Sequence, residues 1–79
     1  VFSEASWDNA VAYMKRAVDV RPEFIYHHYD LALIYIDTKK WSLARQQLEL
    51  IPSLPLIDVM DPVWKQEAAG FLQSIANKK

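Results

Sequence analysis

Two adjacent histidines, His27 and His28, are the residues of this chain whose type is best suited to metal binding or acid–base chemistry. Neighbouring residues on a helix point about 100° apart, so this pair cannot close on one metal ion as two histidines one turn apart could. We therefore interpret the pair as structural, with His28 packed and His27 exposed.

The other groups that could do chemistry are equally isolated. Asp30 and Asp37 lie two helical turns apart, without a nucleophile or base at a spacing suited to acid–base catalysis, and we expect them to form a solvated face. The single glycine, Gly70, lies inside an amphipathic pattern rather than in a phosphate-binding loop. We expect no catalytic residues, no cofactor and no metal, and hence a protein that is not an enzyme.

Composition limits the partners. The 79 residues carry a formal net charge of −1, and the pairs Lys39-Lys40 and Lys78-Lys79 are too short to form a basic stripe, so we expect no nucleic acid. No apolar stretch approaches the roughly 20 residues of a membrane helix, so we expect a soluble chain without a membrane contact. The absence of cysteine favours the cytoplasm but excludes no compartment. Because the chain begins with Val1, we expect it to be a piece of a longer protein.

Three segments in the first two thirds of the chain have helical patterning. Apolar residues recur at three- and four-residue steps from Trp7 to near residue 20, with Ser6 as the expected N-cap. Pro22 suits the first turn of a second helix, which is apolar around more than one face and should be central. A short polar connection, 37–40, forces the third helix, 41–51, to run back antiparallel.

In the last third of the chain the helical pattern is interrupted before it resumes. Pro52 and Pro55 interrupt the pattern, so residues 52–60 form an irregular connection, whose apolar side chains we expect to pack down onto the core. Asp61 followed by Pro62 is a helix-start pair, with the aspartate as cap, and it opens a last amphipathic helix over 61–77.

The helical pattern also repeats. Trp7 and Trp41 stand 34 residues apart (41 − 7 = 34), and small and large apolar residues follow each at matching steps. On these residues the chain resembles the tetratricopeptide repeat (TPR) family. Residues 6–22 resemble the second half of one repeat, with matches at Trp7, Ala10, Met14, Ala17 and Pro22. Residues 23–51 resemble a full repeat, with matches at His28, Leu31, Ala32, Tyr35, Trp41, Ala44, Leu48 and Ile51.

The resemblance implies a single all-α domain over 1–79, built of antiparallel helix-hairpin repeats. It would have about four helices, the last of which caps the C-terminal end of a solenoid fragment. Small residues at Ala10, Ala32 and Ala44 would let neighbouring helices approach closely. The first helix lacks its own partner helix, so we expect an unmatched apolar face there, covered by upstream chain or by a second copy.

In this family the first helix of each repeat lines a concave groove. The resemblance implies that the groove is lined by Tyr26, Tyr29, Leu33 and Ile36, with Asp37 at the rim, and that the chain is a scaffold that binds a peptide or protein segment. Two alternatives stay open. Tyr29 and Leu33 could instead pack against the missing upstream helix or against the last helix. The chain could also be a structural cap or a self-association module, forming a homodimer through exposed end faces, with no external ligand.

Overall fold

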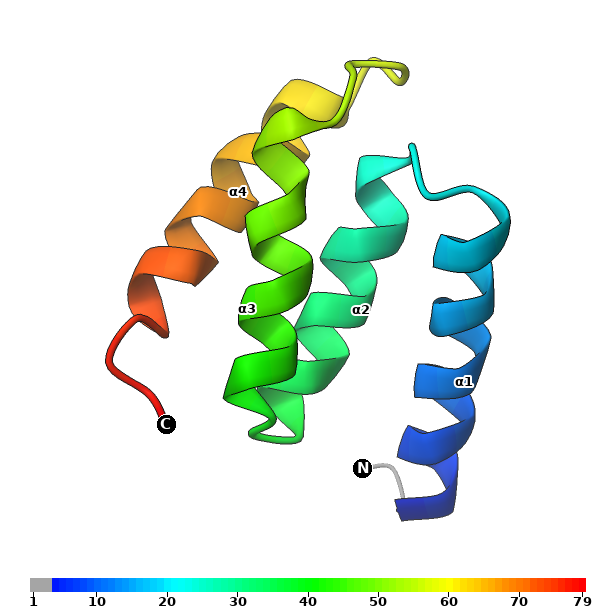
Figure 1. Cartoon of the computed structure of the whole chain (residues 1–79), viewed down its shortest axis with the longest axis vertical. Coiled ribbons are helices and arrows are strands. Elements are labelled where there is room, and N and C mark those ends of the chain that lie inside the picture. The colour runs from blue at the N-terminus through cyan, green and yellow to red at the C-terminus, as the bar shows by residue number, and fades with distance from the viewer. Residues whose placement is uncertain (1–3) are drawn as a thin grey trace.

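The computed structural model describes residues 4–79 and consists of helices joined by short segments (Figure 1). The helices are α1 (Glu4–Val20), α2 (Ile25–Asp37), α3 (Trp41–Leu50) and α4 (Asp61–Ser74), and a single 3₁₀ turn, η1 (Ile51–Ser53), extends α3. The described residues contain no strand. The predicted all-α class with four helices is confirmed.

Helix α2 is central, and each helix runs opposite to the one before it (Figure 1). Helix α3 packs along α2, helix α1 packs on another flank of α2, and α4 packs against both α2 and α3. Among the described helices, α1 packs against α2 but not against α3 or α4. Among the described residues, none of these helices is long and apolar enough to cross a membrane.

The start of α2 differs from the prediction, because Pro22 lies in a turn before the helix. The backbone N–H of Phe24 donates to the carbonyl of Arg21 at 3.3 Å, which closes this turn. Phe24 is then extended (φ −84°, ψ 119°), the conformation typical of an N-cap residue, and the helix begins at Ile25. The proline therefore shapes the turn between α1 and α2 rather than the first turn of α2.

Both predicted caps are also wrong. Helix α1 is already formed at Ser6, which lies inside it. Asp61 is the first residue of α4, and its carboxylate accepts hydrogen bonds from the backbone N–H groups of Ile57 and Asp58, each at 2.8 Å. The side chain of Asp61 thus organises the preceding connection instead of capping the helix. Helix α4 ends at Ser74, three residues before the predicted end.

The turn between α2 and α3 is closed by its own backbone. Lys39 has a positive φ of 61°, and its N–H donates to the carbonyl of Ile36 at 3.0 Å. The N–H of Lys40 donates to the carbonyl of Tyr35 at 2.7 Å. This pair of bonds is a Schellman motif, which satisfies carbonyls that a helix end otherwise leaves free. The motif returns the chain at once and makes α3 antiparallel to α2.

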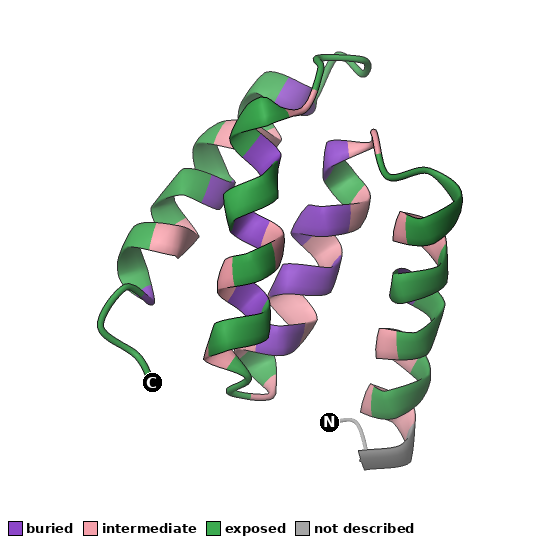
Figure 2. Cartoon of the chain, in the orientation of Figure 1, coloured by how far each residue is buried: buried purple, intermediate pink, exposed green. Residues whose placement is uncertain are grey.

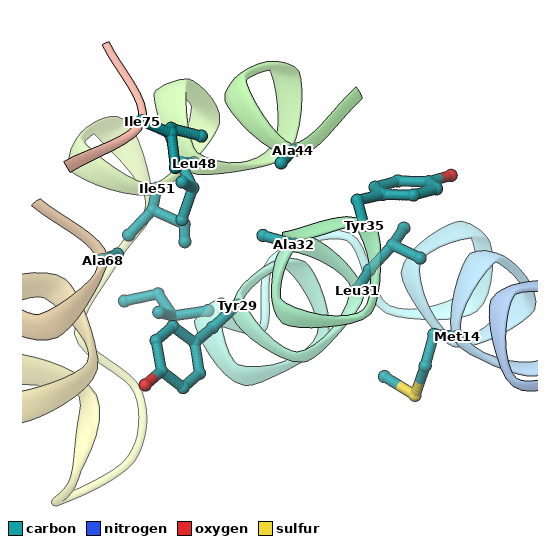
Figure 3. Packing of buried hydrophobic residues seen from close by; sticks show 11 residues of the cluster. Met14, Tyr29, Leu31, Ala32, Tyr35, Ala44, Leu48, Ile51, Ala68 and Ile75 are labelled. Atoms are coloured by element: carbon teal, nitrogen blue, oxygen red, sulfur yellow. The ribbon is translucent and has the colours of Figure 1, made fainter. Parts of the chain in front are cut away.

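The core lies mainly on α2 and the helices around it (Figures 2 and 3). Its buried apolar residues are Met14, Ile25, Tyr29, Leu31, Ala32, Tyr35, Ala44, Leu48, Ile51, Ala68 and Ile75. Ala32 of α2 and Ala44 of α3 are fully buried and lie where these two helices face each other (Figure 3). Side chains of this size allow a close helix approach, as expected from the sequence.

Helix α1 packs against α2 through its apolar stripe. The stripe residues that join the core are Val11, Met14, Ala17 and Val18. The exposed side of α1 is mostly polar, and its two exposed large apolar side chains are Tyr13 and Val20. Helix α2 thus covers these four residues of the stripe, whereas Trp7 and Val11 also line a hollow of about 300 Å³, and a cover by upstream chain or a second copy stays a prediction.

Candidate functional site

The two histidines have structural contacts. His28 is 3% exposed, and its ring nitrogens lie 2.8 Å from Oε1 of Gln47 and 2.7 Å from the carbonyl oxygen of Pro22. A carbonyl only accepts, so Nε2 of His28 carries a proton and donates to Pro22. Nδ1 of His27 lies 3.3 Å from the carbonyl oxygen of Arg21. His28 is packed, as predicted, and links the start of α2 to α3. The described residues form no cluster of three metal-ligating side chains.

Three of the five predicted groove residues lie on the open face of α2. Tyr26, Leu33 and Asp37 follow one another at helical steps, and Asp30 falls between them, so all four share one side of the helix. Tyr26 and Asp37 are exposed, whereas Leu33 and Asp30 are half-buried. Ile36, the fourth predicted residue, is also half-buried, and both Leu33 and Ile36 pack against the core.

Tyr29, the fifth predicted residue, packs against α4. It is 6% exposed, and its ring lies 5.2 Å from that of Trp64 and 6.1 Å from that of Phe71 between centroids. The hydroxyl of Tyr29 donates to Oε2 of Glu67 at 2.6 Å. Burial, together with the hydrogen bond and negative charge of Glu67, raises the pKa of Tyr29 to about 12. The alternative in which Tyr29 packs against the last helix is the one that the structure shows.

A pocket opens where α2 and α4 begin, under the connection that joins α3 to α4. Its volume is about 460 Å³. The lining residues are mostly apolar or aromatic: Phe24, Tyr26, His27, Ile57, Asp58, Met60, Asp61 and Trp64. The rings of Tyr26 and Trp64 meet within it, 5.6 Å apart between centroids. A concave apolar site of this size with a few polar groups is typical of ligand-binding pockets.

The connection above this pocket exposes its apolar side chains, contrary to the prediction that they pack down. Leu54 is half-buried, but the later members of the segment are exposed: Leu56, Ile57, Val59 and Met60. Hydrogen bonds explain this conformation, since Asp61 holds two backbone N–H groups and Oδ1 of Asp58 accepts from the N–H of Met60 at 2.9 Å. The backbone is thus fixed by aspartates, and the apolar side chains are left facing solvent.

A second hollow follows the first along α4. It measures about 420 Å³ and is lined by Tyr29, Glu67, Gly70, Phe71 and Ser74. These α4 residues lie on the turns that follow Trp64 of the first pocket. We name the two hollows and the open face of α2 beside them the α2–α4 groove.

The charge of the α2–α4 groove is negative. Neither 22–38 nor 46–64 contains a lysine or an arginine. The nearest guanidinium, that of Arg21, lies 5.8 Å from the ring centroid of Phe24 and pairs with Glu23 at 3.6 Å. Asp30 and Asp58 have no ion pair within the part of the chain that the structure describes. Burial raises the pKa of Asp30, and the nearby His27 opposes this shift.

Of the five residues predicted for the groove, Tyr26 lines the first pocket and Tyr29 the second hollow, whereas Leu33, Ile36 and Asp37 line neither, and the assignment of all five to a binding groove stays a prediction. Sequence reasoning missed Ile57, Met60 and Trp64. The signal that could have found the first two of these is the run of apolar residues between Pro55 and Pro62, interrupted only by aspartates. No family model, no curated protein and no solved structure matches the chain.

Proposed function

We propose that this chain is a TPR-type helical module that binds a segment of a partner protein in the α2–α4 groove. Support for the repeat assignment comes from the alternating directions of the helices and from the placement of α2 between α1 and α3. The buried alanines, Ala32 and Ala44, occupy the helix contact where the repeat pattern requires small residues.

The observation that carries the binding function is the apolar pocket of about 460 Å³ with exposed apolar side chains at its rim. Exposed apolar side chains gathered around a pocket typically mark an interaction site in a protein. The aromatic rings of Tyr26 and Trp64 offer a large contact area, as residues at the centre of protein interfaces do. An apolar side chain of a partner that is buried against these two rings would stabilise the complex, because apolar surface is removed from water.

The groove is held in shape before any partner arrives. The Tyr29–Glu67 hydrogen bond fastens α4 to α2, and Asp61 fixes the connection. A preformed site loses less conformational entropy on binding than a mobile one. Because the carboxylates of Glu67 and Asp61 already have structural partners, we propose binding without catalysis.

A second candidate function is supported by another hollow, outside the α2–α4 groove. An apolar depression of about 290 Å³ lies between the end of α3 and α4, and its wall includes Leu48, Ile51, Ala68 and Leu72. This end face could receive a helix of a second copy or of a neighbouring repeat. The chain would then be a structural cap or a self-association module.

The proposed function is tested by capture of partners from cell lysate, followed by binding with the purified partner. The bait is the chain itself, and Tyr26→Ser with Ile57→Ser removes two exposed groove side chains. Tyr13→Ser is the matched control, because Tyr13 is 74% exposed on α1, outside the groove. We expect the groove variant to lose a partner that the chain and the control both bind directly.

The same preparation separates the two functions. If groove variant and control retain the same proteins, the groove is not the binding surface. If in addition the chain associates with itself as its concentration rises, and Ala69→Arg at the 290 Å³ end face abolishes this association, the self-association module replaces the groove.

A further inference from the structure

We infer that the partner segment of the α2–α4 groove is a basic peptide, in which one bulky apolar side chain enters the pocket and lysines or arginines follow at defined spacings. This inference rests on the proposed function and adds the chemistry of the ligand. The pocket supplies the apolar contact, and the carboxylates around it supply the charge complementarity.

The charge distribution favours a basic partner over an acidic one. The segments that form the groove carry carboxylates at Glu23, Asp30, Asp37 and Asp58, whereas 22–38 and 46–64 contain no lysine or arginine. Lys65 lies on α4, but its Nζ donates to the carbonyl of Pro52 at 3.1 Å, away from the pocket residues. Arg21 lies over Phe24 of the pocket but pairs with Glu23, so an anionic ligand would meet net repulsion from Asp30, Asp37 and Asp58. A cationic ligand would meet complementary charge there.

Asp30 provides the sharpest point of recognition. Its side chain is half-buried and has neither a hydrogen bond nor an ion pair within the described part of the chain. Burial raises the pKa of Asp30 although the nearby His27 opposes this shift, so the ionised carboxylate is held at a cost that a ligand ammonium or guanidinium would relieve. Asp58 lines the pocket from the connection before α4 and is exposed, whereas Asp30 lies on α2, one turn after Tyr26. The two carboxylates thus come from different elements of the groove, the connection and α2.

The spacing of the carboxylates along α2 determines the spacing of the cations that we expect in the peptide. Asp30 follows Tyr26 by four residues, or roughly 6 Å along the helix axis, and Asp37 lies about 10.5 Å beyond Asp30. An extended peptide advances about 3.3 Å per residue. A cation two residues after the anchor therefore reaches Asp30, and another three residues later reaches Asp37. Asp58, which lines the pocket, is the carboxylate that we assign to a cation before the anchor.

Four synthetic peptides test this inference against the purified chain. The basic probe is acetyl-KSWSKSSK-amide, in which the tryptophan is the anchor. Its matched controls are the neutral QSWSQSSQ, the acidic ESWSESSE and the anchorless KSGSKSSK, with the same end groups. Binding is followed by NMR through the indole N–H of Trp64 and the backbone amides of Ile57 and Met60, which line the pocket.

We expect the basic probe to bind best, the neutral one more weakly and the acidic one weakest, with the difference reduced by added salt. Asp30→Asn and Asp58→Asn should each weaken the basic probe by about two- to fivefold, the range for partly exposed ion pairs, and leave the neutral probe unchanged. The amide at position 58 keeps the oxygen that accepts from Met60. Glu49→Gln is the control, because Glu49 is exposed on α3 and outside the pocket.

The outcomes separate the two proposals. Equal affinity of basic and neutral probes, without an effect of salt, overturns the charge preference and leaves the groove as a binding site. Equal binding of KSWSKSSK and KSGSKSSK overturns the apolar anchor. Absence of shifts at Trp64, Ile57 and Met60 with every probe overturns both the groove and its ligand. Self-association that Asp58→Asn removes would assign the basic segment to a second copy of the chain.

Discussion

The two connections around α3 contrast sharply. Between α2 and α3 the chain reverses in a Schellman motif, in which the N–H groups of Lys39 and Lys40 satisfy carbonyls of α2. Between α3 and α4, residues 54–60 form a longer connection that Asp61 holds by hydrogen bonds. The first connection exposes lysines over a buried helix contact, whereas the second exposes apolar side chains over a pocket.

This difference shows which apolar side chains are buried on folding and which remain exposed. The core depends on small and large apolar residues of α2 and α3, which the short turn brings together. The long connection is fixed by polar bonds, so most of its apolar side chains contribute little to the core. Apolar side chains that folding does not bury are free to contact a partner. Substitutions in the two regions should therefore have opposite effects on stability and binding.

The largest effect is expected at the α2–α3 contact, for Leu48→Ala. Leu48 is 1% exposed, and its truncation should lower the free energy of unfolding by about 2–5 kcal/mol through lost burial and a cavity. Urea unfolding followed by circular dichroism measures this loss. Leu43→Ala is the control, since Leu43 is exposed on the same helix. An equal loss in both variants would contradict the assigned core face of α3.

Overpacking tests the same contact from the other direction. Ala44 has 0% exposure and faces Ala32, so Ala44→Leu should force α2 and α3 apart and lower the free energy of unfolding by about 1–3 kcal/mol. Thermal unfolding gives the measurement. Ala12→Leu on the exposed side of α1 should leave the midpoint nearly unchanged. An unaltered midpoint for Ala44→Leu would count against close packing of these helices.

The sequence predicted this hairpin well, because its information is local. Apolar steps of three and four residues identify α2 and α3, and the alanines mark where the two helices approach. It left open whether Tyr29 lines the groove or packs against the last helix, since that depends on how α4 is placed. Nor did it predict the exposed connection, whose conformation depends on the side-chain bonds of Asp61 rather than on any periodicity.

The contact of α2 with α4 is tested by pH. The pKa of Tyr29 is about 12 in the folded chain against 10.0 for an unperturbed tyrosine, so the unfolded chain loses this proton first. The free energy of unfolding should therefore be independent of Tyr29 below about pH 10 and fall as pH rises toward about 12. Tyrosine labelled with ¹³C at Cζ reports the titration by NMR.

Glu67→Gln sharpens this result. The variant removes the negative charge of Glu67, and we expect the pKa of Tyr29 to fall from about 12 toward 10.0 without reaching it, because burial is the largest cause of the shift. Glu49→Gln on α3 should leave the titration of Tyr29 unaltered. A Tyr29 pKa that stays near 12 in Glu67→Gln would show that the carboxylate of Glu67 does not raise it.

A small increase in the free energy of unfolding is expected from a substitution in the short turn between α2 and α3. Lys39 adopts φ 61°, where a Cβ is unfavourable, so Lys39→Gly should relieve strain. Glycine also increases the entropy of the unfolded chain, which limits the gain to about 1 kcal/mol in the free energy of unfolding. Lys40→Gly is the matched control, because Lys40 has φ −94° and gains nothing from glycine. A turn stabilised equally by both changes would contradict the left-handed position of Lys39.

The smallest effect on stability should come from the long connection, and it decides whether the contrast has a functional meaning. Val59 is 89% exposed, so Val59→Ser should change the free energy of unfolding by no more than about 0.5 kcal/mol, whereas Leu54→Ser, half-buried in the same segment, should cost more. Chemical unfolding of both variants gives the comparison. A large loss for Val59→Ser would mean that the connection supports the core. A negligible loss means that folding does not depend on this apolar side chain, as expected at the rim of a binding surface.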